Sequence, residues 1–120
     1  MIEIRDFSKE IDINGKIYKI DLGNIQMITK TLNIAKDLEP MLKDFVSDLD
    51  GEKLIAISEK LKSHINAVLG DNAASDILGD KINNINNLLD LSVKLTELVK
   101  NFRNEIITKR ESEYVPEQTK

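Results

Sequence analysis

The chain has 120 residues, of which 41% are hydrophobic and 32% charged, and its formal net charge is -4. This length fits one domain, and the composition is typical of a folded domain with a well-solvated surface. Because there is no cysteine, disulfides, thiolate catalysis and cysteine-ligated zinc are excluded. The acidic balance disfavours nucleic-acid binding, which needs clustered cations.

Targeting segments are not evident in the sequence. No N-terminal stretch combines a basic start with a long apolar run, as a secretory signal would. No apolar run approaches the roughly 20 residues that a bilayer-spanning helix needs. We therefore expect a cytoplasmic protein that does not contact membranes.

A β-hairpin is predicted at about residues 10–21. Apolar and polar residues alternate on both sides of Asn14-Gly15, a pair favoured in type I′ turns because both central residues have φ > 0. The resulting register places Ile13 opposite Lys16, Ile11 opposite Tyr18 and Glu10 opposite Lys19. The apolar face must be covered by helices or by another subunit, since an isolated hairpin is barely stable in water. Ile2 and Ile4 also alternate with polar residues and predict a third short strand.

Helical spacing follows the hairpin, from about residue 24. The first apolar row is Ile25, Ile28, Leu32 and Ala35, and a rotated row continues with Leu38, Leu42, Phe45 and Leu49. Pro40 lies between the two rows. Proline disrupts a helix interior, so we expect a kink, or a short break near residues 36–39 with Asp37 as the cap of the next helix.

A second helix is predicted after the Asp50-Gly51 turn. Its apolar row is Leu54, Ile57, Leu61, Ile65 and Val68. Gly70 is placed where a helix commonly stops. Between Asp71 and Gly79 there is room for at most two short turns of helix.

The last predicted helix is the longest, about residues 80–109, with Asp80 as its N-cap. One heptad-like row consists of Ile85, Leu88, Ser92, Leu95, Val99, Phe102 and Ile106. Two further rows hold Ile82, Leu89 and Val93, and Leu91 and Leu98. Such wide apolar coverage predicts more than one neighbour. Those neighbours are either the rest of a core, or a partner helix or second copy that meets the heptad-like row.

The sequence thus predicts a mostly α fold, in which an N-terminal β-hairpin precedes a small helical bundle with a long C-terminal helix. Residues 1–110 form the single domain. Residues 111–120 are polar and aperiodic, and we expect them to be a disordered tail.

Catalytic and metal-binding constellations are not found. His64 is the single histidine, and we interpret it as an ordinary polar position on a helix. Asp48, Asp50 and Glu52 surround Gly51 but lack the alternating ligands of a calcium loop, so a turn and helix start is the better interpretation. No phosphate-binding glycine motif is present. We expect no enzymatic activity, no metal and no cofactor.

The segment Ile13–Asp21, INGKIYKID, resembles the start of small tail-assembly chaperones of long-tailed phages and prophages of low-GC Gram-positive bacteria. Those proteins often begin with an NGK-x-Y-x-hydrophobic-D hairpin and continue as a mostly helical body. The resemblance is close over the hairpin and general in character elsewhere. It implies a protein that binds the long helical tape-measure protein and keeps it soluble while the tail tube assembles. Many members also have a longer form made by a programmed frameshift.

The resemblance transfers no individual binding residue, so the candidate contacts come from the apolar pattern. A helix-covering protein needs an apolar face for amphipathic helices, and the last helix and the hairpin are the predicted contacts. The candidates are Leu88, Leu91, Leu95, Leu98, Phe102, Ile11 and Tyr18, while Asn14 and Gly15 form the structural turn. The alternatives are self-association, and a small helical interaction module or regulator encoded by a mobile element.

Overall fold

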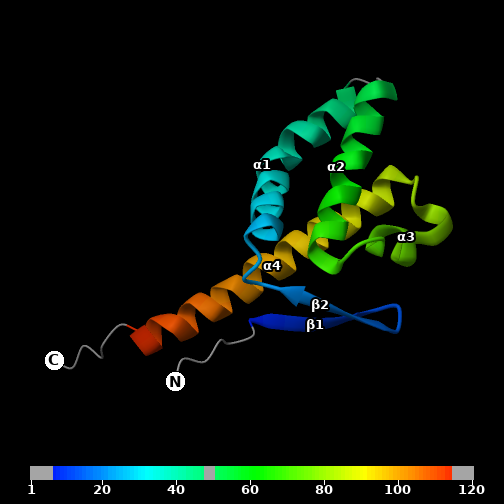
Figure 1. The fold of residues 1–120 in the computed structure, drawn as a ribbon. Coiled ribbons are helices and arrows are strands. Elements are labelled where there is room, and N and C mark those ends of the chain that lie inside the picture. The colour runs from blue at the N-terminus through cyan, green and yellow to red at the C-terminus, as the bar shows by residue number, and fades with distance from the viewer. Residues whose placement is uncertain (1–6, 48–50, 115–120) are drawn as a thin grey trace.

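The computed structural model describes residues 7–47 and 51–114. The elements are β1 (Ser8–Ile13), β2 (Lys16–Asp21), α1 (Ile25–Ser47), α2 (Gly51–Leu69), α3 (Ala73–Leu78), the 3₁₀ turn η1 (Gly79–Lys81) and α4 (Ile85–Tyr114). The predicted fold is confirmed: a two-stranded antiparallel hairpin precedes a helical body, and the last helix is the longest (Figure 1). The helices α1 and α2 run antiparallel, and both contact α4.

The hairpin has the register that its turn sequence predicts. Ile11 pairs with Tyr18, Ile13 with Lys16 and Glu10 with Lys19. Asn14 and Gly15 have φ values of 55° and 86°, as a type I′ turn requires. The Asp12 carboxylate accepts a hydrogen bond of 2.8 Å from the Gly15 amide. The predicted third strand at Ile2 and Ile4 lies outside the described residues.

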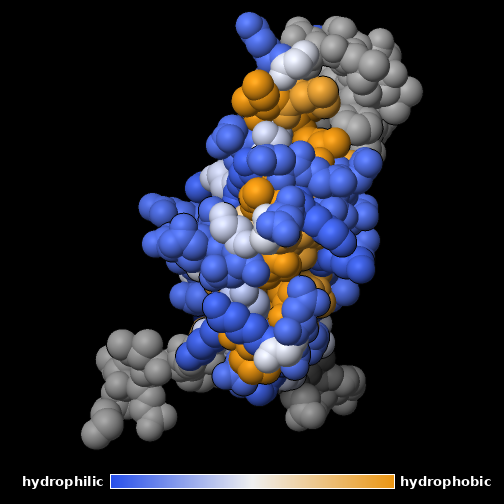
Figure 2. All heavy atoms as spheres, turned by 90° about the vertical axis from the view of Figure 1, so that its right-hand side faces the viewer, coloured by the Kyte–Doolittle hydropathy of each residue, from blue (hydrophilic) through white to orange (hydrophobic). Residues whose placement is uncertain are grey.

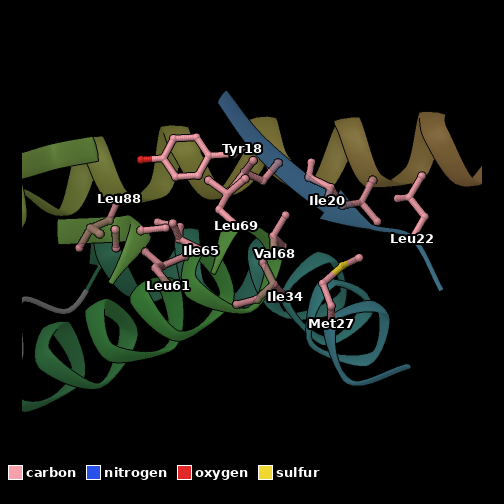
Figure 3. Close-up of a cluster of buried hydrophobic side chains, with 14 residues drawn as sticks. Tyr18, Ile20, Leu22, Met27, Ile34, Leu61, Ile65, Val68, Leu69 and Leu88 are labelled. Atoms are coloured by element: carbon pink, nitrogen blue, oxygen red, sulfur yellow. The ribbon is translucent and has the colours of Figure 1, made fainter. Parts of the chain in front are cut away.

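The apolar face of the hairpin is buried on the helices. In Figure 3, Tyr18 and Ile20 of β2 and Leu22 just after it reach into one cluster with side chains of α1 and α2. The helical members of this core are Met27, Ile34, Leu61, Ile65, Val68, Leu69, Ala73, Ala74, Leu88, Leu95 and Val99. The core therefore supplies the cover that a two-stranded hairpin needs to persist in water.

Pro40 does not end α1, so the predicted break near residues 36–39 is wrong. Proline removes one backbone N–H and crowds the preceding turn, which bends a helix that is held elsewhere by packing. In Figure 1 the second half of α1 leans toward α2. Asp37 is consequently not a cap, and its carboxylate lies 3.9 Å from the ammonium of Lys60. The side chains of Leu42 and Phe45, and all of Leu49, lie outside the described part.

The helix α4 begins at Ile85 rather than at Asp80. Asp80 belongs to η1, and the Asn84 side chain caps α4 instead. Its Oδ1 accepts from the amides of Asn86 and Asn87, at 3.0 and 3.3 Å. Both Asp and Asn are good caps, and the tight turn through η1 selects the later one.

The same helix continues to Tyr114, so the prediction of a disordered tail is wrong for residues 111–114. Residues 115–120 lie outside the described part. Near the helix end, the Arg110 guanidinium lies 5.1 Å from the ring centre of Phe7. One turn earlier, Lys9 of β1 lies 3.8 Å from the Glu105 carboxylate. These contacts with the start of the hairpin support the last turns of α4.

The substitution Gly15→Val should destabilise the protein through backbone strain, because Gly15 has a φ of 86°. No atom lies within 4 Å of the position that a Cβ would take, so the Cβ itself meets no neighbour. A β-branched residue at this positive φ should cost about 1–2 kcal/mol of unfolding free energy. Gly15→Asn should cost less, because asparagine tolerates the left-handed region. Urea unfolding monitored by circular dichroism would test this, and equal losses for both variants would contradict it.

Candidate functional site

The predicted partner-binding residues fall into two groups. Leu88 is 0% exposed, Leu95 1% and Tyr18 7%, so these three belong to the core of the protomer. Leu88 and Leu95 lie on the covered face of α4, and Tyr18 of β2 packs into the same core, so the prediction that these three are accessible contacts is wrong for the protomer. The remaining candidates are half-buried side chains that pack against this core, namely Ile11, Leu91, Leu98 and Phe102.

A chain of buried polar side chains crosses the core from α1 through α2 to α4. Thr31, His64 and Ser92 are 2%, 1% and 0% exposed. The Thr31 hydroxyl lies 3.1 Å from His64 Nε2. On the other side of the ring, His64 Nδ1 lies 2.6 Å from the Ser92 hydroxyl. One imidazole thus links three helices.

The hydroxyl and ring hydrogens of Thr31, His64 and Ser92 can be assigned from their hydrogen-bond partners. Thr31 donates its single hydroxyl hydrogen to the Met27 carbonyl, at 2.9 Å, and therefore accepts from His64 Nε2–H. His64 Nδ1 is then the acceptor for the Ser92 hydroxyl hydrogen. The neutral Nε2–H tautomer satisfies every member. Within the described residues, no buried side-chain nitrogen or oxygen lacks a hydrogen-bond partner.

Burial keeps the ring uncharged at neutral pH. Desolvation by burial and, to a smaller extent, the positive charge of Lys30 together lower the pKa of His64 from 6.5 to about 4. A neutral imidazole is also what the hydrogen-bond pattern requires. A second proton on the ring would turn Nδ1 into a donor and displace the Ser92 hydroxyl hydrogen.

A serine bonded to a histidine is also found in nucleophilic catalysis, but this pair lacks the other requirements. Ser92 is 0% exposed, so no substrate reaches its hydroxyl. The third member is Thr31 rather than the carboxylate that orients a catalytic imidazole. Across the described ranges, no three histidine or acidic side chains lie close enough together to hold a metal ion. The polar chain is therefore a structural link between helices.

The interpretation of His64 as an ordinary helix position is wrong, although the sequence contained a signal. His64 falls in the apolar row of its helix, three residues after Leu61 and four before Val68. Ser92 is likewise the polar member of the heptad-like row. Two polar residues within apolar rows indicate a buried pair, because a buried polar group needs a partner. The contribution of Thr31 from a third helix carried no such signal.

The most accessible apolar row lies on α1. Ile25 is 78% exposed and Leu32 51%, while Ile28 and Ala35 between and beyond them are half-buried. We call these four residues the outer row. It has the spacing predicted for a buried helix face, yet α1 buries Met27, Thr31 and Ile34 instead.

Other exposed apolar side chains of the described residues are scattered. Ile17 lies on β2, Ile55 on α2 and Ile107 on α4, with 57%, 65% and 45% exposure. Figure 2 shows a largely hydrophilic face crossed by a narrow line of apolar atoms, with more of them at the end where α2 begins. Single exposed apolar residues are normal on proteins. A row in helical register on one element is the feature that calls for an explanation.

Two adjoining grooves between α1 and α2 have charged side chains along their rims. Both are lined by Lys30, Glu59 and Ser63, together with other charged and amide side chains. Lys30 donates a hydrogen bond of 3.0 Å to Ser63 across them. Side chains of both signs that already interact with each other favour hydration of these grooves. The outer row on α1 is therefore the candidate functional surface.

Comparison with known protein families, with curated proteins and with solved structures finds no significant match to this chain. None of the helices among the described residues has both the length and the apolar character needed to cross a membrane.

The buried imidazole should make stability depend on pH. The folded-state pKa of about 4 lies below the unfolded value of 6.5, so the unfolded chain binds more protons between these values. Stability should therefore fall as pH drops from 6.5 toward 4, by about 3 kcal/mol at 1.36 kcal/mol per unit. Urea unfolding across this range would measure it, with His64→Gln as the non-titrating control. Parallel pH profiles of the unfolding free energy for the two proteins would contradict this prediction.

The internal position of the heptad-like row also leads to a prediction. Leu95→Asp places an unpaired charge in the core, and we expect a loss of more than about 4 kcal/mol that unfolds the domain. Leu98→Asp, at a half-buried position of the same helix, should cost less and retain the helical circular dichroism. If Leu95→Asp remained folded with near-native stability, the core assignment of this row would be refuted.

Proposed function

We propose that this chain is a non-enzymatic helix-binding protein, and that the outer row of α1 is its contact surface. In its specific form, the proposal is a tail-assembly chaperone that binds and solubilises the tape-measure protein in the cytoplasm of the bacterial host.

The observation that carries the general part is a helical apolar row that the protomer does not cover. Ile25 and Leu32 are mostly accessible, although their spacing with Ile28 is that of a helix face made for packing. An amphipathic partner helix lying along α1 would bury these side chains against its own apolar residues. Ile28 and Ala35, the half-buried members of the outer row, would then become fully buried.

The specific part rests on the resemblance of the Ile13–Asp21 hairpin to the opening of tail-assembly chaperones. A tape-measure protein is long, helical and apolar on one face, and it aggregates when that face is uncovered. A row of aliphatic side chains along one helix is a suitable match for such a partner. No binding residue of that family is carried over, and the contact surface is argued from this chain alone.

A small helical interaction module or regulator would use the same row for a different target. A second copy of the chain is another occupant of the same row. A tape-measure gene close to this reading frame would favour the chaperone and would supply the fragment for the test. Specific affinity for an unrelated protein would favour the regulator.

The substitution Leu32→Asp should weaken binding of an amphipathic tape-measure fragment at least about tenfold, because it puts a charge in the middle of the contact. Since Leu32 is 51% exposed in the free protein, its helical circular dichroism should not change. Co-expression, co-purification and titration of the fragment would measure the loss.

The matched control is Asn33→Asp. It adds the same charge at the next residue, which is exposed and lines the groove toward α2. It should bind as the unmodified protein does. Unchanged binding by Leu32→Asp would refute the outer row as the contact. If Leu32→Asp lowers the molar mass of the protein in solution when no fragment is present, the row is instead a contact between copies of the protein.

A further inference from the structure

We propose that Thr31 is a positioning residue: its hydrogen bond to His64 fixes the rotation of α1 and keeps the outer row facing away from the core. The inference deepens the proposed function, because the presented row is its contact surface. It concerns only the free protein, however, and can be tested without a partner.

The helix α1 has two apolar rows between which hydrophobic burial does not clearly choose. The inner row, which packs on the core, consists of Met27, Thr31, Ile34 and Leu38, and the outer row consists of Ile25, Ile28, Leu32 and Ala35. The inner row carries a hydroxyl at its centre, whereas the outer row is entirely aliphatic. Apolar burial, which scales with the aliphatic area removed from water, would accept either row.

The hydrogen bonds among Thr31, His64 and Ser92 decide which of the two rows faces the core. His64 and Ser92 are held in α2 and α4, and the ring offers its Nε2–H toward α1. The two rows lie about 100° apart around α1. If α1 turned by that angle, an aliphatic side chain would replace the Thr31 hydroxyl. A buried N–H would then lose its partner, which costs more than an average hydrogen bond contributes.

Other polar contacts of α1 with α2 are poor substitutes. The hydrogen bond from Lys30 to Ser63 is exposed, and the Lys60–Asp37 pair at 3.9 Å has side chains 61% and 44% accessible. Water screens and competes with such contacts. The Thr31–His64 bond is buried, so its loss is not compensated by water.

The absence of cysteine permits a direct test by thiol labelling. Leu32→Cys reports on the outer row and Ile34→Cys on the inner row, each as the single cysteine of the protein. With Thr31 present, the outer position should react with Ellman's reagent at least about 100 times faster than the inner one. Thr31→Val keeps the shape of the side chain but removes the hydroxyl. It should lower this ratio at least about tenfold.

Two control variants separate positioning from a general loss of packing. Thr31→Ser retains the hydroxyl and should retain the ratio. Thr96→Val removes another buried hydroxyl, which is 5% exposed and bonds only within α4 to the Ser92 carbonyl, at 2.9 Å. It should leave the ratio unchanged. An unchanged ratio in Thr31→Val with intact circular dichroism would overturn the proposal, as would an equal effect of Thr96→Val.

If Thr31→Val fails to fold, the tautomer of His64 in the unmodified protein decides. Nitrogen NMR should show the hydrogen on Nε2, and a hydrogen on Nδ1 would overturn the proposal. All of these measurements use the isolated protein. A normal labelling ratio without partner binding would therefore refute the proposed function alone, and binding with an unchanged ratio in Thr31→Val would refute the positioning role alone.

Discussion

The structure depends on how a single imidazole is satisfied in an aliphatic core. His64 has two ring nitrogens that both need partners away from water, and each partner comes from a different helix. Leaving either nitrogen unpaired would cost about 1–3 kcal/mol, a large share of the roughly 5–15 kcal/mol that stabilises a small domain. The rotations of α1, α2 and α4 are therefore coupled at one point. Aliphatic packing around this point is less directional and follows the setting that the hydrogen bonds impose.

This constraint explains why the heptad-like row of α4 is internal. Ser92 can reach His64 only if the face that carries it is turned toward α2, and Leu88 and Leu95 share that face. Farther along the same row, Phe102 packs near the hairpin, where Lys9 lies 5.8 Å from the Phe102 ring centre. The wide apolar coverage of α4 thus serves the hairpin and the helical pair together. It does not indicate an unoccupied face.

Local features were predictable from the sequence, and features set by distant residues were not. The hairpin and its register follow from Asn14-Gly15, because the turn geometry is decided within a few residues. The start of α4 at Ile85 does not follow from the sequence, because Asp80 and Asn84 are both competent caps and the intervening turn decides between them. The helical period revealed the outer row of α1 but not its orientation. Leu32 is more hydrophobic than Thr31, yet Thr31 is the buried residue. The sequence pattern did not predict this, because the partner of Thr31 is His64, which lies 33 residues away in the sequence.

A helix-binding protein has to keep apolar side chains accessible in a free state that remains folded and dispersed. Hydrophobic burial works against this, since a helix with two apolar rows can lower its exposed area by turning. A buried polar contact on one row opposes such turning, because that row must then stay in the core even if the other row is more apolar. The cost to the free protein is limited, as only Ile25 and Leu32 of the outer row are mostly exposed. A net charge of -4 adds repulsion between copies. In this view a hydroxyl inside the core determines which aliphatic surface remains available outside it.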